Sequence, residues 1–310
     1  MRRGGGGNRG GRGGGRRAAG VSELLAQALY SGLLQGGSYA LLALGLALVF
    51  GTTRVINLAH GELVLLAAYV AHTAETALGL APPLAIPLAL LVVCPAAAGV
   101  HAVVSRIGAD REINSLIATF GIGVVLTNLM LLLWHADARS TGSSWLQEAV
   151  VLGPLYSMRG ELLFGAASLL LLGALWWWLA RSWYGRALRA VAADRDAAAL
   201  MGVDPGRAEL AAFLLAGALA AVAGVALYSY GVVQPALGGA LTVKAFVITV
   251  LAGVGSIPGV LLGAMLLGVA EALTVTLASS ALQELAGMAL FLLVLLFLPN
   301  GLLGATRRRG

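Results

Sequence analysis

Long apolar runs alternate with short polar breaks along most of this chain. Each run has about 17–27 residues, which is enough for an α-helix to cross a hydrocarbon core of about 30 Å at a rise of about 1.5 Å per residue. The pattern therefore predicts an all-α, polytopic integral membrane protein with eight to nine transmembrane helices. The predicted spans lie near residues 24–50, 58–79, 85–105, 113–134, 161–180, 208–231, 238–254, 258–277 and 283–299.

Two longer polar segments interrupt these spans and indicate the orientation of the chain. Residues 181–207 contain five arginines, whereas residues 135–160 contain two. Because short cytoplasmic loops carry the excess of basic residues, we expect 181–207 to lie in the cytoplasm and 135–160 outside. Counting crossings from this anchor places the following arginines inside: Arg54, Arg106, Arg111, Arg307, Arg308 and Arg309.

The first twenty residues differ in composition from the rest. Residues 1–20 hold six arginines, many glycines and no acidic residue, which predicts a disordered tail. An arm that binds RNA or anionic lipid is the functional alternative. Counting crossings places this tail outside, unless 24–50 makes a second, partial crossing where Gly36 and Gly37 interrupt it. Residues 304–310 form a second, short basic tail.

Composition narrows the class of protein further. With 59% hydrophobic and 11% charged residues and a mean hydropathy of +0.89, the chain lies far outside the range of soluble domains. The tail's six arginines account for the whole excess of 20 basic over 14 acidic residues, so no nucleic-acid partner is expected for the neutral body. A single cysteine excludes a disulfide framework, and no metal cluster or catalytic motif is present in the sequence. We expect neither a catalytic site nor a cofactor.

The cytoplasmic segment 181–207 has the clearest local pattern. Residues 186–201 are rich in alanine and separate apolar positions such as Leu188 from charged ones such as Arg195, which predicts one short amphipathic helix. Gly202 and the Asp204-Pro205 pair end the pattern. Such a helix either docks a cytoplasmic partner or rests on lipid headgroups.

The chain resembles a known family in several segments. Asp196-Ala197-Ala198, three residues and Gly202 resemble the EAA-x3-G loop with which permeases of ATP-binding-cassette (ABC) importers engage their ATPases. Asp replaces the Glu of that motif, and the downstream Ile-x-Leu-Pro is absent. Over about residues 21–303, the chain is similar to LivH-type permeases of branched-chain amino acid ABC importers. The segments that carry the likeness are 45–70, 114–128, 186–205 and 244–272.

The resemblance implies an ABC importer permease fold over residues 21–303, in a multi-pass protein of a bacterial inner membrane. The implied function is translocation of leucine, isoleucine, valine or similar amino acids. The implied partners are two ABC ATPase subunits, which bind the ATP, a second homologous permease and an extracytoplasmic substrate-binding protein. A permease for urea or short amides is the near alternative, and a self-sufficient ion-coupled transporter is the alternative of another class. The ATPase-coupling residues would be Arg189, Asp194, Asp196, Ala197, Ala198 and Gly202.

Polar residues gather where the second span begins. Arg54, Asn57 and His60 are spaced by three, so a helix would place them on one face at the cytoplasmic boundary, with Glu62 nearby. The cluster either gates the inner mouth of a path or caps the helix, with Asn57 as N-cap and Glu62 near the positive helix end.

Two charged residues fall inside later spans. Lys244 and Glu271 each lie about 9 Å from the outer end of their spans, which predicts a buried ion pair, because an unpaired charge in a membrane is costly. The pair is either structural or meets a zwitterionic substrate. Asn128, in the fourth span, either lines the path or makes a hydrogen bond between helices.

Overall fold

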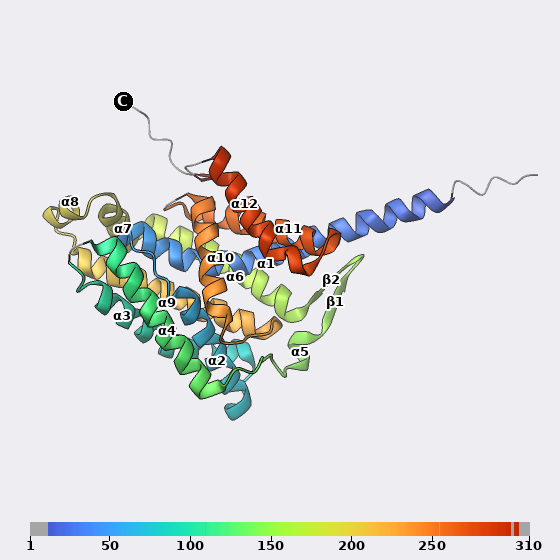
Figure 1. Ribbon diagram of the computed structural model, residues 1–310, viewed down its shortest axis with the longest axis horizontal. Helices are drawn as coiled ribbons and strands as arrows, with labels where there is room; N and C mark the ends of the chain where they lie inside the picture. The colour runs from blue at the N-terminus through green and yellow to red at the C-terminus, as the bar shows by residue number, and fades with distance from the viewer. Residues whose placement is uncertain (1–11, 109, 254, 299–300, 304–310) are drawn as a thin grey trace, which may run out of the picture.

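The computed structural model of the chain describes residues 12–108, 110–253, 255–298 and 301–303, with side chains from residue 22 onward. Helices dominate this part of the chain (Figure 1). The elements, in chain order, are α1 (Arg12–Thr53), α2 (His60–Leu78), η1 (Pro82–Ala85), α3 (Ile86–Val104), α4 (Arg111–Trp134), α5 (Ser144–Gln147), β1 (Ala149–Leu152), β2 (Leu155–Met158), α6 (Arg159–Arg181), α7 (Trp183–Ala193), α8 (Arg195–Leu200), α9 (Pro205–Tyr230), α10 (Leu237–Ala252), α11 (Ile257–Leu277), η2 (Ser280–Leu282) and α12 (Gln283–Phe297).

A helix occupies each of the nine predicted spans, which confirms the all-α membrane fold. Among the described residues, seven helical segments are long and apolar enough to cross a membrane. The two predicted spans outside that group are α2 and α10, which has 16 residues. The hairpin and the α7–α8 segment lie at opposite ends of the molecule (Figure 1), as the predicted orientation requires.

The first helix is continuous, so the alternative of a second, partial crossing at Gly36 and Gly37 does not apply. α1 runs unbroken for 42 residues, and Gly32 and Gly36 let it lie close to α11. A Cβ at Gly36 would lie 2.7 Å from the Cα of Met265, and one at Gly32 would lie 2.6 Å from the Cα of Val269. Small residues allow helix backbones to approach in this way inside a membrane.

The helix α1 also reaches back into the predicted tail. Residues 12–20 are helical, whereas residues 1–11 and 304–310 lie outside the described part of the chain. Gln27 donates to the Tyr156 carbonyl at 2.7 Å, and the hydroxyls of Tyr30 and Ser157 lie 3.1 Å apart. The described start of α1 is therefore on the same side as the hairpin, and the division of the chain at residue 20 stays a prediction.

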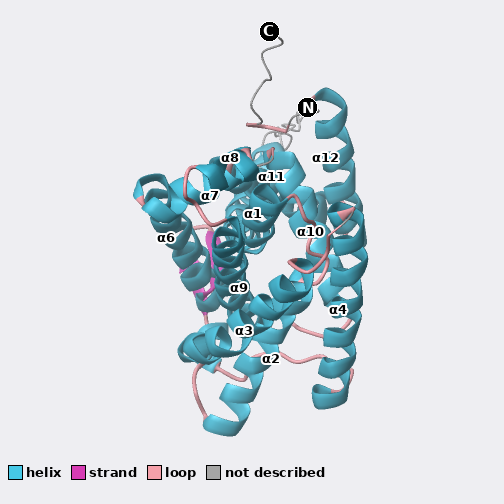
Figure 2. Ribbon diagram, turned by 90° about the vertical axis from the view of Figure 1, so that its left-hand side faces the viewer, coloured by secondary structure: helices cyan, strands magenta, loops and turns pink. Residues whose placement is uncertain are grey.

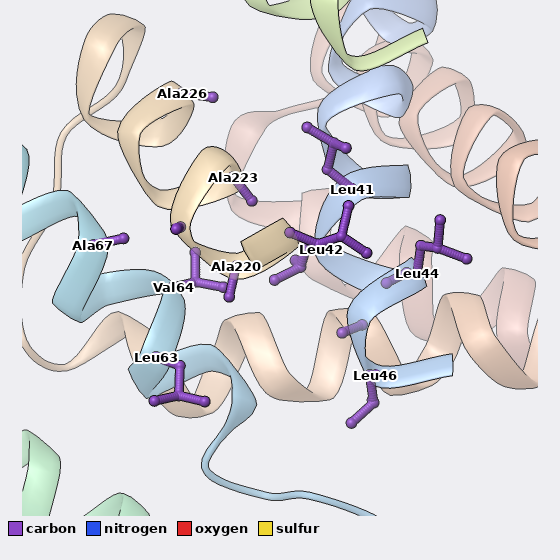
Figure 3. Close-up of a cluster of buried hydrophobic side chains, with 14 of the residues drawn as sticks. Leu41, Leu42, Leu44, Leu46, Leu63, Val64, Ala67, Ala220, Ala223 and Ala226 are labelled. Atoms are coloured by element: carbon purple, nitrogen blue, oxygen red, sulfur yellow. The ribbon is translucent and has the colours of Figure 1, made fainter. Parts of the chain in front are cut away.

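The core consists mainly of small aliphatic side chains at the crossing of α1, α2 and α9 (Figure 3). Leu42 of α1 faces Val64 of α2 and Ala220 of α9, whereas Leu44 points to the opposite side of α1, and all four side chains are buried. Alanine and glycine at these crossings let the helices pack closely, which is the means of helix association available where lipid is as apolar as leucine. Figure 2 shows α4 and α12 at one edge of this bundle and α6 at the other.

The segment 135–160, which the sequence predicts as one polar loop, contains more structure. It folds into α5 and an antiparallel hairpin, in which β1 and β2 pair from Ala149 with Met158 to Leu152 with Leu155. The Glu75 carboxylate, near the end of α2, fixes the segment to the bundle. It accepts hydrogen bonds from the Thr141 hydroxyl at 2.8 Å, from the Gly142 amide at 3.3 Å and from the Tyr228 hydroxyl. These contacts give hydrogen-bond partners to polar groups whose positions the hydropathy pattern does not predict.

Candidate functional site

The segment 181–207 forms two helices, so the prediction of one helix over 186–201 is wrong. α7 ends at Ala193 and α8 begins at Arg195, because Asp194 has extended backbone angles, φ −156° and ψ 113°. The Asp194 carboxylate accepts the amides of Asp196 at 3.0 Å and Ala197 at 2.9 Å. It is thus the N-cap of the second helix.

The predicted apolar face of this segment does pack inward. Leu188 and Val191 of α7 are buried with Ala198 of α8 against the ends of α6 and α9. Arg189 lies on the exposed side, and its guanidinium donates to the carbonyl of Leu179 at 2.8 Å, which ties α7 to α6. The segment is therefore attached firmly to the membrane helices at its base.

The free end of α8 carries two exposed apolar side chains. Leu200 is 88% exposed and Met201 is 84% exposed, next to a turn in which Gly202 has φ +84°. Asp196 and Ala197 are exposed on the same short helix. The side chains of Leu200 and Met201 are therefore largely free of contacts within the described part of the chain and open to a partner. The resemblance to the EAA loop did not indicate Leu200 and Met201, although two large apolar residues directly before a turn were visible in the sequence.

An ion cluster connects α8 to the bundle. Glu209 of α9 is 1% exposed and holds Arg111 of α4 at 2.7 Å and Arg195 of α8 at 3.4 Å. One buried carboxylate thus joins α8 to the first turn of α4.

The structure forms the predicted pair of Lys244 and Glu271. The Lys244 ammonium lies 2.9 Å from one Glu271 oxygen and 3.1 Å from the other. Tyr39 donates to Glu271 at 2.8 Å, Gln283 donates to it at 2.9 Å, and Lys244 also donates to the Tyr39 hydroxyl at 2.9 Å. The network joins α1, α10, α11 and α12 beside a mostly apolar cavity of about 250 Å³. Both charges are fully compensated, which indicates a structural role.

The cluster at the start of the second span differs from its prediction. α1 ends at Thr53 and α2 begins only at His60, so Arg54 and Asn57 lie in a non-helical segment and share no helix face with His60. The Asn57 side chain accepts the Ala59 amide at 3.1 Å in a turn, while the N-cap position of α2 is Ala59. The predicted helical face and the Asn57 N-cap are both wrong.

The second helix also begins deeper than predicted. The His60 imidazole Nε2 lies 2.8 Å from the carbonyl oxygen of Leu42, eleven residues before the end of α1. At a rise of about 1.5 Å per residue, this places the start of α2 about 16 Å from that end of α1. Residues 54–59 therefore fold back into the bundle, and Val55 is fully buried among α1, α3 and α9. Non-helical backbone at such depth occurs where it is buried in protein or lines a cavity.

The N-terminal ends of α2 and α10 meet at this point. The Gly61 amide donates to the Thr242 hydroxyl at 2.8 Å, and that hydroxyl lies 3.2 Å from the Leu58 carbonyl. A Cβ on Gly238, in the first turn of α10, would overlap the Glu62 carboxylate. The absence of side chains at Gly61 and Gly238 is what allows two helix ends to approach so closely.

Glu62 stands between these two helix ends and beside a cavity of about 230 Å³. Its side chain is buried, at 6% exposure, and its Oε2 has no hydrogen-bond partner among the described residues. Asn128, on α4, also lines this cavity and donates to the Val124 carbonyl at 2.8 Å. Helix N-termini carry partial positive charge, and two of them face the Glu62 carboxyl group. No group of three metal-ligating side chains occurs in the part of the chain that the structure describes.

Comparisons with known proteins place these features in context. The profile of the family described as "Branched-chain amino acid transport system / permease component" matches residues 28–298. The chain is 35% identical over 294 residues to the high-affinity branched-chain amino acid transport system permease protein BraD of Pseudomonas aeruginosa, covering 90% of this chain and 95% of the relative. It is 32% identical over 309 residues to the permease protein LivH of the corresponding Escherichia coli K12 system, with the same coverage.

Among solved structures, the chain is similar to PsaBC from Streptococcus pneumoniae in complex with Fab. The TM-score is 0.45 at 16% identity, covering 89% of this chain and 95% of that chain.

Proposed function

The chain belongs to the family of permease components of branched-chain amino acid transport systems, and from this premise we propose that it is a translocation subunit of an ABC importer for leucine, isoleucine, valine or similar amino acids. The observation that carries the proposal is the extent of the match, which spans the whole helical bundle and the α7–α8 segment. The sequence motifs and the relatives agree on this class of protein.

In this proposal, partner chains hydrolyse the ATP. The exposed tip of α8, with Leu200 and Met201, docks into an ABC ATPase on the cytoplasmic side. Closure of two such ATPases moves α8, and the Glu209 cluster passes the movement to Arg111 at the start of α4. α4 forms one wall of the cavity beside Glu62, so its displacement changes access to that cavity.

The other partners cover surfaces that the chain leaves open. Few residues in the apolar spans of α4 and α12 are buried within the chain, 17% and 11% respectively, so these faces are available to a second permease and to lipid. α5 and the outer hairpin present exposed Trp145, Val151 and Tyr156 toward the side from which an extracytoplasmic binding protein delivers substrate. The proposed location is the inner membrane of a bacterium.

Purification of a tagged chain from its native membranes tests the composition of the complex. We expect two ABC ATPase polypeptides or two copies of one, and a second permease of the same family, to be retained in mild detergent and identified by mass spectrometry. A urea or amide system would retain the same classes of partner but respond to a different substrate. Recovery of the chain alone, together with substrate transport driven by an ion gradient without ATP, would support the self-sufficient transporter instead.

A further inference from the structure

We propose that Glu62 is the counter-ion for the ammonium group of the amino acid as it passes through the permease, with the cavity beside it receiving the aliphatic side chain. This inference rests on the proposed function and adds the place in the chain where substrate is recognised.

Glu62 is a buried carboxyl group that has no cationic partner among the described residues. None of the ion pairs in the described part of the chain involves it, although its side chain is only 6% exposed. The ends of α2 and α10 contribute partial positive charge and hold the carboxylate in place. Ionisable residues inside membranes are otherwise paired or face a path for ligand or ion. The unpaired Oε2 therefore points to a cation that enters and leaves.

Lys244 and Glu271 provide the internal comparison. That pair lies in the same bundle, and four helices supply it with a partner for each charge. The pair therefore has no unpaired charge that a ligand could neutralise. Glu62, in contrast, has a free oxygen and an adjacent cavity, which is the arrangement expected of a binding group.

The cavity beside Glu62 has mixed walls that suit an aliphatic amino acid. Leu58, Phe120 and Val124 provide apolar surface, whereas Thr127 and Asn128 provide polar groups. Its volume of about 230 Å³ is several times the share of about 30 Å³ that one water molecule takes, so a branched side chain fits. Gly239, in the first turn of α10, also lines the cavity, and helix N-termini favour carboxylates. A zwitterion thus finds a partner for each of its charges.

The first test uses the complete reconstituted transporter with Glu62→Gln, which removes the charge and keeps the shape. We expect leucine uptake to fall by about thirtyfold or more, as for truncation of one partner of a buried charge pair. Stimulation of ATP hydrolysis by the leucine-loaded binding protein should persist, because α8 is unaltered. Glu284→Gln is the matched control, since Glu284 is an exposed carboxylate on α12 that lines the other cavity. It should leave both activities unchanged.

The outcomes separate the two proposals. If the leucine-loaded binding protein does not stimulate ATP hydrolysis by the wild-type complex, the proposed function is contradicted. Full leucine uptake by the Glu62→Gln variant would overturn the inference about Glu62 and leave the proposed function intact. Uptake by the wild type that requires a sodium or proton gradient would assign Glu62 to an inorganic cation and would also overturn the inference.

The second test measures whether the cavity favours cationic over anionic reagents, and it does not depend on transport. Cys94 is the only cysteine, so a Cys94→Ala background permits labelling at Asn128→Cys, on the exposed wall of the cavity. A cationic methanethiosulfonate reagent should react at least tenfold faster than an anionic one, consistent with attraction by one nearby, partly desolvated charge. Addition of Glu62→Gln should remove this preference. An unchanged ratio of the two rates would contradict a role for Glu62 in attracting cations.

Discussion

Replacing Leu200 and Met201 together with glutamate is expected to abolish ATP-driven uptake while the permease remains folded in the membrane. Both side chains are more than four-fifths exposed and stabilise nothing within the chain, so the substitution leaves the fold unaltered. Apolar anchors of an interface contribute about 2 kcal/mol each, so loss of two weakens ATPase docking by about a thousandfold. Retention of the ATPases on the purified variant, by quantitative pull-down, measures the effect.

The control for this prediction lies on the opposite side of the membrane. Val151→Glu, on the outer hairpin, also places an acidic residue at an exposed apolar position, with 70% exposure in the wild type. It should leave ATPase retention unchanged. Normal retention by the Leu200→Glu/Met201→Glu variant would show that the tip of α8 is not the docking surface.

Replacing Lys244 with methionine is expected to cost about 3–5 kcal/mol of stability, because it leaves the buried Glu271 carboxylate without a cation. Glu271→Gln should be similarly harmful, since it leaves the Lys244 ammonium unpaired. The double variant removes both charges while the Gln side chain still accepts the Tyr39 hydroxyl, so its stability should be close to that of the wild type. Thermal unfolding of the purified variants, followed by loss of monodisperse protein, measures these differences.

Additive losses would contradict the pairing. If the double variant unfolds at a temperature as low as the sum of the single effects predicts, the two charges do not compensate each other in the folded protein. Glu284→Gln serves again as control, because no ion pair holds Glu284 in the described part of the chain and its removal should leave the unfolding temperature unaltered.

The helices were predictable because a span in lipid must be long, apolar and continuous, and all three properties are readable from the sequence. The Lys244–Glu271 pair followed from the same reasoning, since both charges fall at similar depth. The break between α7 and α8 was not predicted, because the pattern placed Asp194 inside one helix over residues 186–201. Its carboxylate instead caps the next helix, because it accepts hydrogen bonds from the backbone amides at the start of α8.

The depth of Glu62 could not be predicted from the sequence. Counting crossings gives the order and direction of the spans, but it places every span start at a membrane boundary. The start of α2 lies inside the bundle because α10, which is distant in sequence, supplies Thr242 and Gly238 to meet Gly61 and Glu62. A contact of this kind depends on tertiary packing, and the residues of one segment alone do not reveal it.

The most direct test of the central claim is leucine uptake into proteoliposomes that contain this chain, its co-purified permease and ATPases, and a binding protein from the same organism. We expect accumulation of labelled leucine that requires ATP and the loaded binding protein, and that stops when this chain is omitted. Isoleucine and valine should compete, whereas urea should not. Uptake that proceeds without this chain, or that needs no ATP, would contradict the claim that it is a translocation subunit of an ABC importer.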